Sequence, residues 1–90
     1  MAPQAVSGQT TINSTPTLIT TGLIGASWLV FHAPAGGNQI YIGGATVSTT
    51  TGLELHKGQS VTIWLPENTK IYGIVASGTE TLPWLLTGGA

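Results

Sequence analysis

The sequence contains no cysteine, no arginine and no aspartate. Without cysteine the chain can form neither a disulfide nor a thiolate metal site, so its stability must come from packing. Only 6% of the residues are charged, whereas roughly 25% are charged in an ordinary soluble domain. With a net charge of -1, the chain lacks the basic surface that neutralises nucleic-acid phosphates. We therefore expect no nucleic-acid partner.

Long apolar runs are missing as well. The most apolar segment, residues 18–37, is interrupted by threonine, serine, histidine, glycine and proline. It falls short of the roughly 20 predominantly apolar residues that span a bilayer. The first 17 residues contain neither the positively charged region nor the apolar run of a secretory signal. We expect a soluble protein made in the cytoplasm, without a membrane partner, whose hydroxyl and amide surface suits an assembly.

Two regions of different composition divide the chain. Residues 1–17 are rich in serine, threonine, glutamine and proline, and their only sizeable apolar side chains are Val6 and Ile12. This composition predicts an extended or flexible N-terminal arm, with a short strand near residues 10–13. Such an arm either stays loose or orders against a neighbouring subunit. Residues 18–90 form the predicted β-sandwich domain, which is small enough to benefit from a partner subunit.

The region after residue 17 consists of short β-branched and aromatic runs separated by glycine, proline, asparagine and serine. This pattern is typical of an all-β sandwich or barrel, and no window of helical length keeps a helical period. We predict a small antiparallel β-sandwich, or a jelly-roll-like barrel, of about seven or eight short strands. The expected strands cover residues 18–21, 27–33, 39–42, 45–48, 53–56, 60–65, 70–76 and 82–86.

Turn chemistry predicts a hairpin from residue 60 to residue 76. Pro66 presets the φ angle of a turn, and Asn68 tolerates a left-handed conformation. Alternation along the first strand of this hairpin places Trp64 on the face opposite to that of Ile63.

The tryptophans and two further apolar groups are candidates for an interface. Strand 27–33 carries Trp28 on one face and Phe31 on the other, so we expect another subunit to cover one of its sides. Trp64 lies on the outward face of its strand, and tryptophan is enriched at binding hot spots. The alternative is that the tryptophans are ordinary core residues. The full set of interface candidates is Trp28, Trp64, Tyr41, Ile12 and Val6.

The sequence contains no recognisable catalytic constellation. The glycine-rich segment at residues 43–52 lacks the helix and the lysine of a phosphate-binding loop, so its glycines are assigned to turns or bulges. No nucleophile elbow of the form G-x-S-x-G occurs. We therefore predict no catalytic residues, no enzymatic activity and no cofactor.

Glu54 and His56 form the pair with the most chemical potential. Their spacing places them on one face of a strand, with Leu53 and Leu55 on the opposite, buried face. Carboxylate and imidazole groups ligate metals, but one copy supplies too few ligands unless three copies converge at a symmetry axis. The simpler interpretation is a solvated strand edge without a metal. His32 is interpreted as a hydrogen-bonded histidine at a strand end.

The segment at residues 40–79 combines an Ile-Tyr-Ile-Gly-Gly strand, a Thr-Gly-Leu step before a Lys-Gly turn, and a final Ile-Tyr before Ala-Ser-Gly-Thr. In these features the chain resembles the small all-β virion proteins of tailed bacteriophages. Proteins of this kind are similar to capsid decoration (cement) and minor structural proteins, which commonly form trimers on the outside of the head. The resemblance implies a homotrimer on the virion capsid surface, with the major capsid protein as partner and no catalytic or metal residues.

Two other functions stay open at this point. One is a tail or baseplate component, because the sequence does not distinguish such a protein from a head protein. A head-fibre component could bind carbohydrate by using an exposed aromatic side chain, Trp64 or Tyr41, as a stacking platform.

Overall fold

The computed structural model describes residues 4–22 and 25–88, and every regular element among them is a β-strand. It therefore contains, in these residues, no helix that could cross a membrane. The predicted all-β class and strand number are confirmed. The eight strands are β1 (Gln4–Ile12), β2 (Thr17–Thr21), β3 (Ser27–His32), β4 (Ile40–Gly43), β5 (Leu53–Leu55), β6 (Ser60–Leu65), β7 (Lys70–Val75) and β8 (Glu80–Gly88).

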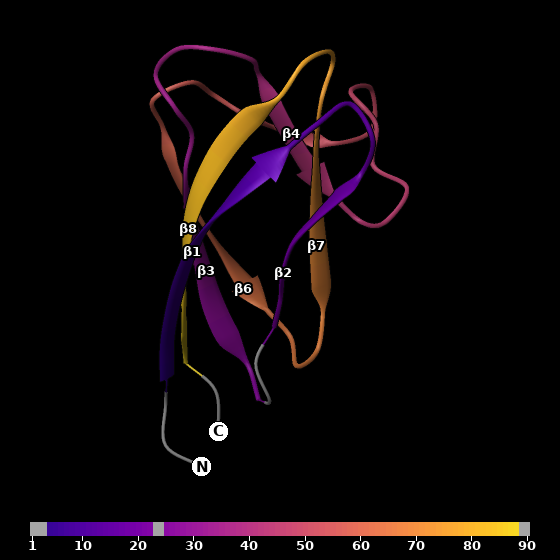
Figure 1. Cartoon of the computed structure of the whole chain (residues 1–90). Coiled ribbons are helices and arrows are strands. Elements are labelled where there is room, and N and C mark those ends of the chain that lie inside the picture. Colours follow the sequence, from indigo (N-terminus) through magenta and orange to yellow (C-terminus); the bar gives the residue numbers. More distant parts are fainter. Residues whose placement is uncertain (1–3, 23–24, 89–90) are drawn as a thin grey trace.

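The strands form two four-stranded sheets that face each other as a sandwich (Figure 1). Sheet A has the order β1-β8-β3-β6, and sheet B has the order β2-β7-β4-β5. Every strand pair in the two sheets is antiparallel. Among the described strands, only β4 and β5 are neighbours both along the chain and within a sheet. Most of the pairing therefore joins distant parts of the sequence.

Strand β1 is an integral part of sheet A. Its nine residues pair with β8, from Gln4 opposite Gly88 to Ile12 opposite Glu80. The expected arm therefore does not exist as a separate unit over residues 4–12, and residues 1–3 of that arm lie outside the described part. The polar composition of β1 has a physical reason: the strand lies at the rim of its sheet, and a strand with mostly solvated faces needs few apolar side chains.

Strands β6 and β7 do not form the expected hairpin. β6 pairs with β3 in sheet A, whereas β7 pairs with β2 and β4 in sheet B. The turn between them still has the predicted chemistry: the Thr69 N–H donates to the Pro66 carbonyl at 3.2 Å, and Asn68 has a φ of 58°. The turn carries the chain from one sheet to the other. The apolar faces of β6 and β7 consequently oppose each other across the core.

The expected strand at residues 45–48 is a loop. Val47 is buried against the outer face of sheet B, where a Cβ placed on Gly43 would lie 2.9 Å from Val47 Cγ2. The Ser48 hydroxyl accepts from the backbone N–H of Thr50 at 3.3 Å and of Thr51 at 3.2 Å. Hydrogen bonds of this local kind compete with strand pairing. The threonine run therefore forms a turn.

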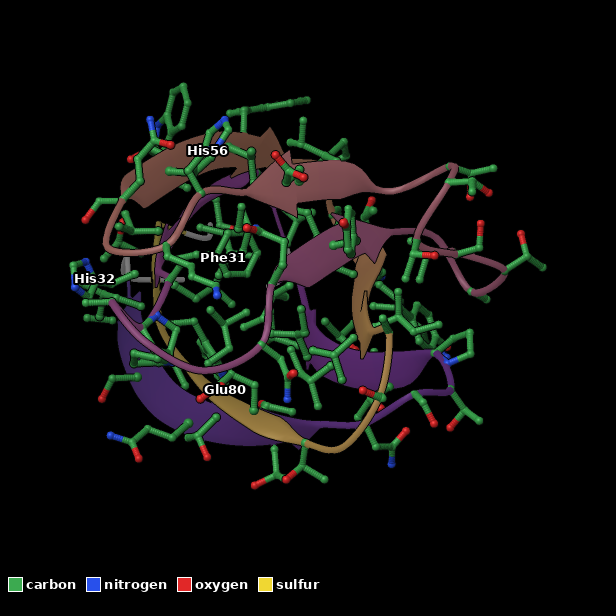
Figure 2. All side chains as sticks on the ribbon, turned by 90° about the horizontal axis from the view of Figure 1, so that it is seen from above. Phe31, His32, His56 and Glu80 are labelled. Atoms are coloured by element: carbon green, nitrogen blue, oxygen red, sulfur yellow. The ribbon has the colours of Figure 1, made fainter. Side chains whose placement is uncertain are left out.

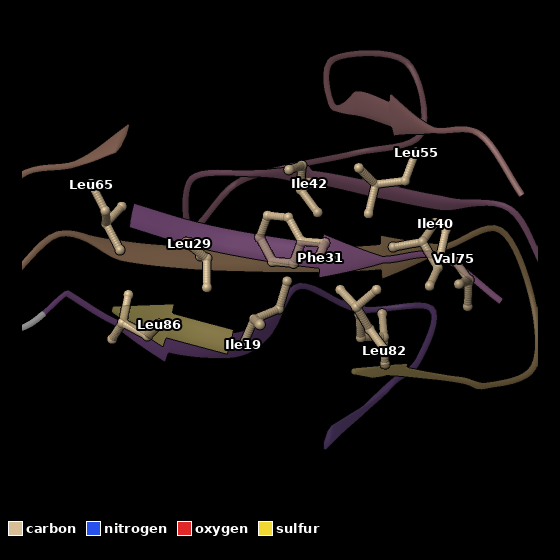
Figure 3. Close-up of a cluster of buried hydrophobic side chains, with 12 residues drawn as sticks. Ile19, Leu29, Phe31, Ile40, Ile42, Leu55, Leu65, Val75, Leu82 and Leu86 are labelled. Carbon is tan, nitrogen blue, oxygen red and sulfur yellow. The ribbon is translucent and has the colours of Figure 1, made fainter. Parts of the chain in front are cut away.

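The core lies between the sheets and follows a period of two. In β3 the side chains of Leu29 and Phe31 are fully buried, whereas those of Trp28 and His32 point outward. Leu53 was expected to be buried with Leu55 but is 56% exposed, because β5 has only three residues at the rim of sheet B. Figure 3 shows most of the buried cluster, which comprises Ile12, Ile19, Leu29, Phe31, Ala33, Ile40, Ile42, Leu55, Leu65, Val75, Leu82 and Leu86.

Candidate functional site

The outer side of sheet A forms an uncharged surface, which we call the outer tryptophan face. The register of the sheet determines its members, because residues directly opposite each other on neighbouring strands point to the same side. The side chains of this face include no acid, no lysine and no arginine. The members are Ala5, Ser7, Gln9 and Thr11 of β1; Thr81, Pro83, Leu85 and Thr87 of β8; Trp28, Val30 and His32 of β3; and Ser60, Thr62 and Trp64 of β6.

Two half-exposed tryptophans contribute the largest side chains of the outer tryptophan face. Trp28 of β3 and Trp64 of β6 are directly opposite each other in the ladder, and they are 53% and 54% exposed. Leu85 of β8 is also exposed, and it pairs with the partly buried Val30 on the same face. Single exposed apolar residues are ordinary, but a contiguous group of them marks an interaction site. Tryptophan in particular presents a large, rigid surface that favours burial in an interface.

A shallow hollow adjoins the tryptophan pair along β3. It has a volume of about 230 Å³ and is lined by Val30, His32, Pro83, Trp84 and Leu85. The His32 Nδ1 atom lies 3.0 Å from the Ser60 hydroxyl, its cross-strand neighbour. This hydrogen bond agrees with the interpretation of His32 as a partnered strand-end residue. Figure 2 shows His32 on the outside of the sandwich, whereas Phe31, the preceding residue, points into the interior.

The five interface candidates do not gather in one place. Trp28 and Trp64 come together on the outer tryptophan face, as described above. Tyr41 is opposite Glu54 on sheet B, so it lies on the other side of the molecule. Val6 is 39% exposed, but it points to the inner side of sheet A, opposite the buried Leu86. 

Ile12 is not an interface residue within this fold. Its side chain is fully buried in the core cluster, and a Cβ placed on Gly73 of β7 would lie 2.8 Å from its Cδ1 atom. The prediction was wrong because it assigned Ile12 to an arm. In the structure β1 ends with this residue between the two sheets.

The Glu54 and His56 side chains do lie together, as their spacing predicts. The His56 Nδ1 atom is 3.5 Å from Glu54 Oε1, and both side chains are exposed. Within residues 4–22 and 25–88, no third acid, histidine or cysteine joins them in a metal-binding group. An exposed pair of this kind contributes little to stability because water screens it. The pair is on the sheet B side, away from the outer tryptophan face.

The other two carboxylates hold loops in place. Glu80 Oε2 accepts from the Asn38 backbone N–H at 2.8 Å, and Glu67 Oε1 accepts from the Gly25 N–H at 3.0 Å. A hydrogen bond between a charged acceptor and a backbone N–H is stronger than one between neutral groups. The chain therefore uses two of its three acids to fix connections between the sheets, a role that the sequence analysis did not assign.

Val30, Pro83 and Leu85 complete the apolar part of the face, and the sequence analysis did not identify them. Period-two alternation in β8 places Pro83 and Leu85 opposite to the inward Leu82 and Leu86, so a signal was present. Their membership of the face depends on the position of β8 beside β3, which is a long-range relationship.

No protein-family model matches the chain, and no curated protein matches it at a significant level. The outer tryptophan face is therefore the feature of the described residues on which a functional proposal is built.

Proposed function

We propose that the protein is a non-enzymatic structural protein of a virion, and specifically a capsid decoration (cement) protein. In this proposal it binds the outside of a phage head through the outer tryptophan face and stabilises contacts between major capsid subunits. The resemblance in residues 40–79 suggests the setting, and the surface chemistry of sheet A suggests the mode of binding.

The observation that carries the proposal is the cross-strand pair Trp28 and Trp64 in a surface without formal charge. Burying a charged side chain in an interface costs several kcal/mol unless it finds a partner. A face without acids, lysines or arginines avoids this cost, because its hydroxyl and apolar groups need only neutral partners. The same face would therefore fit a neutral, partly apolar patch that neighbouring capsid subunits present together.

A decoration protein stabilises its shell by mass action. A protein that binds the assembled lattice, and not the separated subunits, shifts the equilibrium toward the lattice. We expect capsids that carry the protein to resist a higher temperature than capsids that lack it. Equal thermal stability of decorated and undecorated capsids, with the protein demonstrably bound, would contradict the cement role.

The binding surface can be tested with two substitutions on the outer tryptophan face and one control substitution on the opposite side of the molecule. Trp28→Ser combined with Trp64→Ser should abolish co-sedimentation with capsids of the parent phage that were produced without the protein. Tyr41→Ser, on sheet B, serves as the matched control and should bind as the unmodified protein does. Retained binding by the double tryptophan variant, with its fold confirmed by circular dichroism, would contradict docking through this face.

The proposal includes a homotrimer in solution, which the resemblance implies. Sedimentation equilibrium of the full chain should give a mass three times that of the monomer. A carbohydrate-binding role is the second candidate, because Trp28 and Trp64 share their face with polar residues: Thr87 is directly opposite Trp28, and Thr62 precedes Trp64 by two residues on the same strand. Glycan binding that the double tryptophan variant loses would support that role.

A tail or baseplate location is the remaining alternative. Labelling the protein in intact particles would distinguish it from a location on the head.

A further inference from the structure

Sheet A has two open edges. Strand β1 pairs only with β8, and strand β6 pairs only with β3, among the strands described in residues 4–22 and 25–88. Each of these outermost strands therefore has one side on which backbone N–H and C=O groups have no ladder partner within the described part of the chain. Such an edge is a template for pairing with another strand, and most proteins protect it.

The edges of sheet A and sheet B differ in this protection. In sheet B, β5 has only three residues with Glu54 at its centre, and β2 has a register shift between Leu18 and Thr20. Short length, charge and irregular register are all known to block edge pairing. In sheet A, β1 has nine residues and β6 has six, and neither strand contains a charged residue or a proline. Only the edges of sheet A are thus suited to pairing over their whole length.

The directions of the two open strands are compatible with each other. Three successive antiparallel pairs separate β1 from β6 in the order β1-β8-β3-β6, so β1 and β6 run in opposite directions. If two copies lie side by side in the same orientation, β1 of one meets β6 of the next as an antiparallel pair. Antiparallel pairing is the arrangement that every ladder of this sandwich already uses.

The side chains next to the open edges are also complementary. On the inner side of the sheet, Val6 of β1 is 39% exposed, and Val61 and Ile63 of β6 are only partly buried. When β1 and β6 of two copies pair, these side chains lie on the same face and cover one another. On the outer side, Trp64 would lie next to the small side chains of β1, such as Ser7.

We propose that the protein associates with a second copy of itself by adding β6 of one copy to β1 of the other, so that sheet A continues across the contact. The contact uses a different surface on each copy, and it forms a closed ring when the rotation between copies permits. This inference does not rest on the capsid proposal, because it concerns backbone pairing between the strand edges of two copies and not attachment to a capsid.

The absence of cysteine from the sequence permits a direct test by disulfide trapping in the full chain. The variants are Val6→Cys, Val61→Cys and Ile63→Cys, each with a single cysteine. After mild oxidation of mixtures, Val6→Cys should form a mixed disulfide with one of the two β6 variants. A disulfide dimer of Val6→Cys alone, in preference to the mixed one, would show a two-fold β1 contact and overturn the proposal.

A second measurement uses charge to block the edge. Val6→Lys should weaken self-association by about tenfold or more in sedimentation velocity, because pairing would bury the lysine. Leu18→Lys is the matched control, since it places the same charge at an exposed leucine on the irregular edge strand β2, and its self-association should not change. A chain that stays monomeric at all concentrations, or equal effects of the two lysines, would overturn the proposal.

Discussion

The indole ring of Trp84 in β8 lies against Gly8, the residue directly opposite it in β1. A Cβ placed on Gly8 would lie 2.7 Å from Trp84 Cζ2. The Trp84 Nε1–H donates to the Thr10 hydroxyl at 3.0 Å, and that hydroxyl donates to the Ile19 carbonyl at 3.2 Å. Ile19 belongs to the irregular part of β2, so this chain of contacts connects the rim of sheet A to the rim of sheet B.

The first prediction concerns this glycine. We expect Gly8→Ala to lower the free energy of unfolding by about 1 to 3 kcal/mol, because the added methyl group displaces the Trp84 ring. Urea denaturation followed by tryptophan fluorescence measures the change. Gly44→Ala is the matched control, since a Cβ there meets no atom within 4 Å, and its effect should stay below about 0.5 kcal/mol. Equal effects of the two substitutions would contradict the close packing at Gly8.

The second prediction concerns Ser27, whose buried hydroxyl has no hydrogen-bond partner among the described residues. Leaving a polar group buried and unpaired costs about 1 to 3 kcal/mol. Ser27→Ala should therefore raise the midpoint of thermal unfolding, while Ser7→Ala, at an exposed position of β1, should leave it unchanged. A lower midpoint for Ser27→Ala would show that the hydroxyl is satisfied.

The third prediction concerns the turn between β6 and β7. Asn68 has a φ of 58°, and a left-handed conformation costs most other residues about 1 to 2 kcal/mol. Asn68→Ala should lose about that much stability, whereas Asn68→Gly should retain the stability of the unmodified protein. Chemical denaturation of the three proteins provides the comparison. If alanine and glycine behave alike, the left-handed conformation does not limit this turn.

The fourth prediction concerns the carboxylate of Glu80. Glu80→Ala removes the acceptor of the Asn38 N–H and should cost about 1 to 3 kcal/mol of stability. Glu80→Gln keeps an acceptor oxygen and should recover part of the loss. Hydrogen exchange at Asn38 gives a local measurement, with faster exchange expected in the alanine variant. Unchanged exchange at this amide would contradict the hydrogen bond.

Local patterns in the sequence determine where most strands lie, but not which strands pair. Alternation located β3, β6 and β7 within one residue of their observed ends, because buried and exposed side chains must alternate on a strand. The same turn residues, Pro66 and Asn68, are compatible with a hairpin and with a crossing between sheets. Burial decides between them, since only the crossing places the inner faces of β6 and β7 on opposite sides of one core.

Part of the candidate site could also be predicted. The outward positions of Trp28 and Trp64 follow from alternation, and the structure places both side chains half-exposed. Their direct pairing required the ladder between β3 and β6, which is a long-range relationship. Ile12 was misassigned for the same reason, since its burial depends on β8 and β7, which lie far along the chain.

The position of β8 in sheet A determines when the strands of this sheet can pair during folding. β8 lies between β1 and β3, although it is the last of the described strands along the chain. During synthesis, β1 emerges before the other described strands and stays without its ladder until Glu80 to Gly88 have been made. Pairing of such distant segments makes folding slow, because the chain loses much entropy before the contacts form. Until then the side chains that β1 exposes are mostly Ser, Thr and Gln, with Val6 and Ile12 as its only large apolar groups, and this composition limits premature association of the nascent chain.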